Sequence, residues 1–249
     1  MPDLAPLTAN GRVLTLTINR PESRNSLSID LLARLRERTA ELRTREDAAV
    51  LILTGEGTAF CAGMDLKLVL SDPHAPLKLL GGLAEFLLEL RALPMVVIGK
   101  VNGAAIGGGC GLATVCDIAV AHADAKLGFP EVDLGVCPAV VAPWLVRKVG
   151  PGRARQILLS GGTMSGQQAF ELGIINHVVP SREALDIAVA ELAQRLATGG
   201  PSALRATKAL LNELDGSLDA DLARRGAELS ARVLASDEAQ SMLRAKLGV

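Results

Sequence analysis

A cluster of five glycines constrains the fold of this chain more than any other feature of its sequence. The cluster lies between Gly103 and Gly111, within the segment VNGAAIGGGCGLATVCD of residues 101–117. Glycine loses more conformational freedom on folding than any other residue, so such a cluster indicates a backbone that must be approached closely. The segment follows a strand-like stretch and runs into small residues from Cys110 to Val115, which predicts a tight strand-to-helix turn.

The familiar phosphate-binding glycine loops do not match this segment. A P-loop requires a lysine after its last glycine, and none follows here; a dinucleotide fingerprint fails because Leu112 stands where its third glycine belongs. Two interpretations remain. The first residues of a helix carry free N–H groups that can bind a ligand oxygen, and close packing of a helix on a sheet also favours glycine and alanine.

Two further stretches favour the ligand-binding interpretation. The segment GTAFCAGMDLKLV (57–69) also follows a strand, and Gly63 precedes a helix start at which Asp65 is expected to be the cap. Two such turns that aim one N–H each at the same oxygen would form an oxyanion hole. In LGFPEVDLG (127–135), Glu131 stands in an apolar run, where burial would raise its pKa and suit it to acid–base work. The alternative for Glu131 is a solvent-exposed turn residue.

The order of the predicted elements indicates an α/β protein with a parallel core. Apolar residues alternate with others over residues 13–18, which predicts a strand, and Ser28 is placed to cap the helix that follows. Buried strands are predicted at 49–55 and 94–103. We therefore expect an α/β core over residues 1–180 and a helical region over residues 181–249.

Helical periodicity continues through this C-terminal region. Ser181 is the expected cap of its first helix, and Pro201 fits the first turn of the second. On that second helix, Leu204, Leu211 and Leu214 are predicted to face inward.

Composition narrows the class of protein. The 249 residues carry a formal net charge of −1, and no Tyr, one Trp and four Phe occur, which argues against nucleic-acid or membrane-surface binding. The three histidines are scattered, so no metal site is expected. The N-terminal residues lack a signal-peptide pattern, and we expect a cytoplasmic protein. Buried free thiols are expected at the four cysteines: Cys61, Cys110, Cys116 and Cys137.

Taken together, these segments resemble the crotonase, or enoyl-CoA hydratase/isomerase, superfamily over nearly the whole chain. The matching motifs are INRPESRNSLS, FCAGMDL, VNGAAIGGGCGLATVCDIAVA, AKLGFPEVDLGVCPA and GRARQILLSGGTMSGQQAFELGIINHVVP. The resemblance implies a crotonase-type spiral of ββα turns with a C-terminal helical trimerisation region, assembled as a homotrimer or hexamer. It also implies a coenzyme A thioester as substrate and no separate cofactor.

The resemblance implies specific roles for residues of the three segments. The backbone N–H groups of Met64 and Gly108 would hold the thioester oxygen, and Glu131 would be the catalytic acid/base. The residues implied to bind the CoA thioester are Ala62, Met64, Asp65, Leu66, Lys67 and Gly108. Lys67 is either a contact to a CoA phosphate or a solvated side chain.

One position departs from the pattern of the well-studied hydratases. Those enzymes carry a second glutamate where this chain has Gly111, and neither Asp117 nor Asp133 is expected to replace it. Enoyl-CoA isomerases of the family work with one glutamate at the position of Glu131. A bacterial subgroup described as methylglutaconyl-CoA hydratase-like, which the chain also resembles, likewise carries glycine there.

The resemblance therefore favours an enoyl-CoA hydratase, on a short branched or polar acyl chain that fills the space left by Gly111. An enoyl-CoA isomerase and a non-catalytic acyl-CoA-binding protein are the alternatives. Two other chemistries are disfavoured. Cys137 lacks the neighbouring histidine that a nucleophile needs, and Ala139 stands where dehalogenase relatives place an acid.

Overall fold

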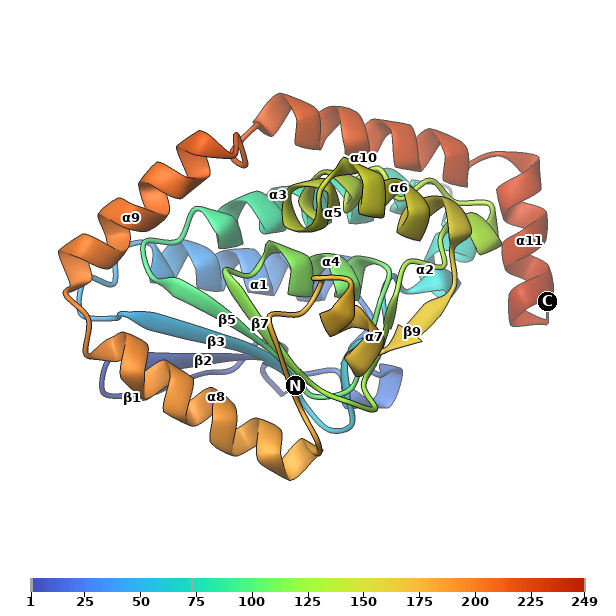
Figure 1. Cartoon of the computed structure of the whole chain (residues 1–249). Coiled ribbons are helices and arrows are strands. Elements are labelled where there is room, and N and C mark those ends of the chain that lie inside the picture. The colour runs from blue at the N-terminus through green and yellow to red at the C-terminus, as the bar shows by residue number, and fades with distance from the viewer. Residues whose placement is uncertain (1, 73, 249) are drawn as a thin grey trace.

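The computed structural model describes residues 2–72 and 74–248, which form two sheets surrounded by helices (Figure 1). The larger sheet has six strands, of which β1 pairs antiparallel with β2 and the others pair in parallel. In spatial order they are β1 (Leu7–Asn10), β2 (Val13–Ile18), β3 (Val50–Gly55), β5 (Val96–Val101), β7 (Ile118–His122) and β10 (His177–Val179).

Short strands that follow those of the larger sheet make up a second, four-stranded sheet. In spatial order they are β4 (Ala59–Cys61), β6 (Ala104–Ile106), β8 (Lys126–Gly128) and β9 (Thr163–Ser165). The chain passes from β3 to β4, from β5 to β6 and from β7 to β8, and helices follow each pair. This succession is the expected spiral of ββα turns, and the predicted fold class is confirmed.

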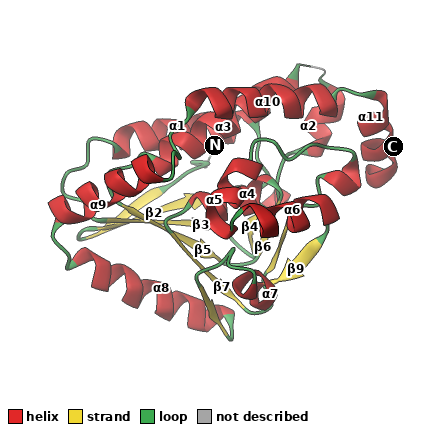
Figure 2. Ribbon diagram, turned by 45° about the horizontal axis from the view of Figure 1, so that its top comes forward, coloured by secondary structure: helices red, strands yellow, loops and turns green. Residues whose placement is uncertain are grey.

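Helices cover both faces of the larger sheet. The helices are α1 (Ile29–Leu42), α2 (Leu66–Ser71), α3 (Ala75–Arg91), α4 (Gly108–Val115), α5 (Ala142–Val149), α6 (Pro151–Ser160), α7 (Gly166–Glu171), α8 (Arg182–Ala197), α9 (Pro201–Leu214), α10 (Ala220–Leu234) and α11 (Asp237–Leu247). α8 packs on one face, whereas α1, α3 and α4 cover the other and α10 lies over α3 (Figures 1 and 2). Two 3₁₀ turns span Pro21–Ser23 and Val132–Leu134.

Local sequence signals account for many element boundaries. The alternation over residues 13–18 becomes β2, with Leu14, Leu16 and Ile18 fully buried. Helix caps form at the predicted serines, since Ser28 accepts the Leu31 N–H and Ser181 accepts the Ala184 N–H. These side chains satisfy amides that have no acceptor inside the helix.

One prediction for the C-terminal region is wrong. Leu211 and Leu214 on α9 do not face inward, because they are 53% and 74% exposed. The face that α9 buries carries Lys208 and Asn212 instead, and Lys208 pairs with Asp117 at 2.8 Å. The division of the chain at residue 180 stays a prediction. Among the described residues, no helix is long and apolar enough to cross a membrane.

Candidate active site

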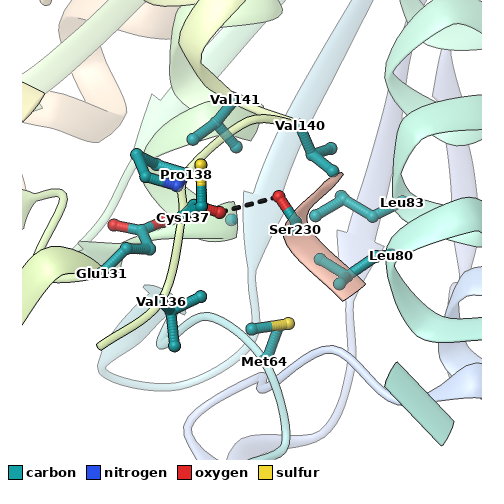
Figure 3. A pocket seen from close by; sticks show the side chains of 11 residues that line it. Met64, Leu80, Leu83, Glu131, Val136, Cys137, Pro138, Val140, Val141 and Ser230 are labelled. Carbon is teal, nitrogen blue, oxygen red and sulfur yellow. Dashed lines mark hydrogen bonds between the residues drawn. The ribbon is translucent and has the colours of Figure 1, made fainter. Parts of the chain in front are cut away.

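Segments far apart in the sequence enclose one pocket beside α4 (Figure 3). Its empty volume is about 270 Å³. Met64, Gly108 and Glu131 are among its lining residues, so the chain folds to bring the three segments singled out above to one place. The complete lining is Met64, Leu80, Leu83, Gly108, Glu131, Val136, Cys137, Pro138, Val140, Val141 and Ser230.

The glycine cluster forms the turn at the start of α4. Gly107 has a φ of +55°, a conformation that side chains rarely adopt, and Gly108 is the first helical residue. The Gly108 N–H therefore has no acceptor within its helix. A Cβ added at Gly109 would overlap the carbonyl oxygen of Cys61, so glycine lets the two turns pack directly against each other.

Met64 lies in the second turn, with its backbone held by an isolated parallel bridge to Leu27. Leu27 donates its N–H to the Gly63 carbonyl at 2.7 Å and accepts the Asp65 N–H at 3.0 Å. In a parallel pairing of this kind, the N–H of the residue between the two bonded positions points away from the partner. The Met64 N–H therefore does not donate a hydrogen bond to Leu27. A Cβ at Gly63 would lie 2.8 Å from the Ile106 carbonyl oxygen, which again requires glycine between the two turns.

Glu131 precedes the 3₁₀ turn Val132–Leu134, and its carboxyl group reaches the glycine turn. Its Oε1 lies 3.0 Å from the place a Cβ would take at Gly107. Its Oε2 is buried and has no hydrogen-bond partner among the described residues. Burial raises the pKa of Glu131 to about 7, and the nearby charge of Asp133 acts in the same direction. The carboxyl group can therefore change its protonation state near neutral pH.

A larger surface pocket, with about 830 Å³ of empty space, adjoins the first one at Met64. The five residues of the segment 57–69 that are implied to bind the CoA thioester all line it: Ala62, Met64, Asp65, Leu66 and Lys67. Asp65 caps α2 as predicted, accepting the Leu68 N–H at 3.4 Å, and it lies 3.5 Å from the Arg20 guanidinium.

Sequence reasoning missed other residues that line this larger pocket, among them Arg24 and Leu247. Arg24 and Asn25 both have positive φ values, of +53° and +58°. The buried Asn25 side chain stabilises this turn by donating to the Glu56 and Ala59 carbonyls and accepting the Arg20 N–H. Arginine before asparagine is a weak signal, because many exposed turns contain such a pair.

The space over Gly111 is filled by the protein itself. A Cβ at this position would overlap Cγ1 of Val141 and lie 3.1 Å from its Cβ. The expectation that an acyl chain occupies this space is therefore wrong for the volume directly above Gly111.

The other two carboxylates considered as substitutes have different partners, as expected. Asp117 pairs with Arg91 and Lys208, and it accepts the Val97 N–H. Asp133 accepts the Gly162 N–H at 2.7 Å from within a 3₁₀ turn.

The loop after Glu131 is anchored by α10, a contact that sequence reasoning also missed. Ser230 donates its hydroxyl to the Cys137 carbonyl at 2.7 Å (Figure 3). The Ser230 hydroxyl also accepts the Ala139 N–H at 3.1 Å. Nearly a hundred residues separate Ser230 from this loop, and a single serine in a helix carries no local signal.

The cysteines are free thiols, and three of the four are buried as expected. Burial raises the pKa of the Cys61 and Cys116 thiols to about 12. Cys137 departs from the prediction, because it is partly exposed and lines the pocket. Over residues 2–72 and 74–248, no group of three or more His, Cys, Asp and Glu side chains could hold a metal ion.

The fold is a spiral of ββα turns, and its pocket places a carboxyl group beside two glycine turns. Comparison with known proteins assigns this combination to a family. The sequence model of the enoyl-CoA hydratase/isomerase family matches residues 8–243. The chain belongs to this family.

Two relatives and one crystal structure illustrate the similarity. The 2,3-dehydroadipyl-CoA hydratase of Escherichia coli is 36% identical over 215 residues, which cover 86% of this chain and 84% of the relative. The crotonyl-CoA hydratase of Syntrophomonas wolfei is 36% identical over 205 residues, covering 81% and 78%. An enoyl-CoA hydratase/isomerase from Mycobacterium paratuberculosis has a TM-score of 0.87 and 28% identity, covering 98% of this chain and 99% of that one.

Proposed function

We propose that this protein is an acyl-CoA enzyme that adds water to a 2-enoyl-CoA. One observation carries the proposal: Met64, Gly108 and Glu131 line a single pocket. The backbone N–H groups of Met64 and Gly108 bind the thioester oxygen, where negative charge develops during the reaction. Removal of one such donor typically costs about 10²–10³ in rate, so two donors supply a large part of the catalysis.

Glu131 performs both proton transfers, because Gly111 provides no second carboxyl group. The Glu131 carboxylate takes a proton from water as the water oxygen bonds to C3. The C2–C3 double bond opens, and electrons move onto the thioester oxygen to give an enolate. Glu131 then delivers its proton to C2, which forms the 3-hydroxyacyl-CoA and restores the carboxylate. A pKa near 7 suits a group that must accept and donate a proton in one cycle.

The larger pocket binds the coenzyme A portion in this proposal. Its side chains include Arg24 and Lys67, whose positive charges suit phosphate groups. Ala62, Asp65 and Leu66 complete the wall next to the thioester. No separate cofactor takes part, since coenzyme A belongs to the substrate.

The test is an assay with 2-enoyl-CoA in which loss of the conjugated thioester absorbance is followed and the product is identified. The wild-type chain is expected to form 3-hydroxyacyl-CoA without added cofactor. Glu131→Gln is expected to abolish turnover, whereas Glu213→Gln, an exposed change of the same charge, is expected to leave it intact. Full activity of Glu131→Gln would overturn the roles proposed here, and acyl-CoA binding without turnover would point to the non-catalytic alternative.

The single carboxyl group of the pocket supports a second candidate, an enoyl-CoA isomerase. In that reaction Glu131 would carry a proton between C4 and C2, with no water added. Supplying 3-enoyl-CoA separates the two reactions. An isomerase would generate conjugated thioester absorbance and no hydroxyacyl product.

We also propose that the chain assembles as a homotrimer or hexamer through its C-terminal helices. Large apolar side chains are exposed there: Leu210, Leu211, Leu214, Leu218 and Leu229. Leu229 also lines a largely apolar groove between α5 and α10. Exposed apolar surface of this extent favours association between subunits. Light scattering at micromolar concentration tests the proposal, and a monomer would contradict it.

Two finer proposals concern subgroup and location. We propose that the chain belongs by sequence with the subgroup described as methylglutaconyl-CoA hydratase-like, because glycine stands at position 111; this proposal concerns sequence relationship and not the substrate after which the subgroup is named. We propose a cytoplasmic location, because free thiols are typical of a reducing compartment.

A further inference from the structure

The end of the small pocket beyond the thioester site is apolar and tightly packed. α3 contributes Leu80 and Leu83, and the loop after Glu131 contributes Val136, Val140 and Val141. Each of these five side chains is at most 6% exposed. Figure 3 shows Val140 and Val141 on one side of the space and Met64 on the other.

The pocket is small. Its empty volume of about 270 Å³ includes space that is open to solvent, so the part enclosed by the five apolar side chains is smaller still. A short acyl chain therefore fits this space better than a long one.

Charge imposes a second restriction. The described residues that line the pocket include no Lys, Arg or His, and their only charged side chain is Glu131. A carboxylate on the acyl tail would be buried without a cationic partner and close to another carboxylate, which is strongly unfavourable. The Ser230 hydroxyl is not available to donate a hydrogen bond to such a carboxylate, because it already donates to the Cys137 carbonyl.

Val141 closes the route along α4. Gly108 and Gly111 are one turn apart on this helix, and three residues advance a helix by about 4.5 Å, a distance that a four-carbon chain spans. At that point the Val141 side chain lies over Gly111, where it leaves no room for an added Cβ. Val141 is 2% exposed, and its N–H donates to the Pro138 carbonyl at 3.1 Å, so its position is well defined.

We propose that Val141, packed over Gly111, closes the acyl end of the pocket and restricts this protein to short, uncharged acyl chains. The proposal rests on the proposed function, because it assumes that the thioester lies at Met64 and Gly108. Val141 acts as a specificity-determining residue that touches the end of the acyl chain.

The experiment compares kcat/KM for 2-enoyl-CoAs of four, six and eight carbons and for glutaconyl-CoA, whose tail ends in a carboxylate. The variants are Val141→Ala and the control Val189→Ala. The control removes the same atoms from a valine that is 1% exposed in α8, in the separate apolar cluster on the other face of the sheet.

The wild type is expected to prefer the four-carbon substrate at least 100-fold over both the eight-carbon and the carboxylate-tailed substrates. Val141→Ala is expected to improve the eight-carbon to four-carbon ratio at least tenfold, since one methylene in an apolar pocket changes specificity 10–200-fold. Val189→Ala is expected to leave the ratio unchanged. A wild type that uses the eight-carbon or carboxylate-tailed substrate within a fewfold of the four-carbon one would overturn the proposal, as would an unchanged ratio in Val141→Ala.

Calorimetric binding of butyryl-CoA and octanoyl-CoA separates this proposal from the proposed function. Preference of the wild type for butyryl-CoA, reduced in Val141→Ala, supports the role of Val141 even if no enoyl-CoA is hydrated, and in that case only the hydratase proposal fails. Equal binding of the two ligands by the wild type overturns the role of Val141.

Discussion

Replacement of Glu131 by glutamine is expected to stabilise the protein at alkaline pH while it abolishes activity. Burial raises the pKa of this carboxyl group from its usual 4.5 to about 7 in the folded chain. Below pH 4.5 the group is protonated in both the folded and the unfolded states, and its contribution to stability is complete. As the pH rises, the unfolded state ionises first, so the folded state loses stability until the pH passes about 7.

The magnitude follows from the change in pKa. Each pH unit between the two pKa values costs about 1.4 kcal/mol, so the loss reaches at most about 3 kcal/mol above pH 7. Glutamine carries no charge at any pH and avoids this loss. The free energy of unfolding of Glu131→Gln should therefore exceed that of the wild type by up to about 3 kcal/mol at pH 8.5, and the difference should shrink toward pH 4.5.

Urea denaturation of the wild type and the variant between pH 4.5 and 8.5 measures this difference. Glu213→Gln is the control, because it removes the same charge from an exposed position on α9. Its stability difference from the wild type should stay nearly constant with pH. If the difference in the free energy of unfolding between Glu131→Gln and the wild type is equally constant with pH, the inference that ionisation of the buried Glu131 destabilises the protein is refuted.

Three further predictions follow from the site and the surface. The kcat/KM for hydration should rise about tenfold per pH unit up to pH 7 and then level off, because the Glu131 carboxylate is the active form; a flat profile would contradict this. Gly107→Ala should lower kcat/KM more than tenfold and stability by about 1–2 kcal/mol, since its Cβ would press on the Glu131 carboxyl group. Its control is Gly216→Ala, because Gly216 has a similar φ of +60° and open space around an added Cβ. This control should lose stability but keep its kcat/KM. Equal kcat/KM in the two variants would count against a contact between the Cβ at position 107 and the Glu131 carboxyl group. Leu214→Glu should reduce the mass measured by light scattering, and an unchanged mass would place the subunit interface elsewhere.

Elements whose sequence signals lie within a few neighbouring residues were predicted correctly. The alternation that forms β2, the Ser28 cap and the Asp65 cap each depend on a few neighbouring residues. The two glycine turns were also recognisable, because close backbone contact requires glycine whatever lies on the other side. Their contact partners, Cys61 for Gly109 and Ile106 for Gly63, became evident only in the structure.

Features that depend on distant residues were not predictable. Val141 fills the space over Gly111 from thirty positions away, and Ser230 reaches the same loop from α10. The reversed orientation of α9 has a similar cause. Helical periodicity alone predicted that Leu211 and Leu214 face inward. In the structure, α9 instead buries Lys208, which pairs with Asp117.

The most direct test of the catalytic proposal is a crystal structure of the protein with a non-reactive acyl-CoA analogue. The thioester oxygen should lie 2.7–3.1 Å from the backbone nitrogens of both Met64 and Gly108, about the distance expected for oxyanion-hole donors. The Glu131 carboxyl group should face C2 of the acyl chain from the other side. A thioester oxygen bound away from either nitrogen, or a Glu131 side chain turned out of the pocket, would contradict the account.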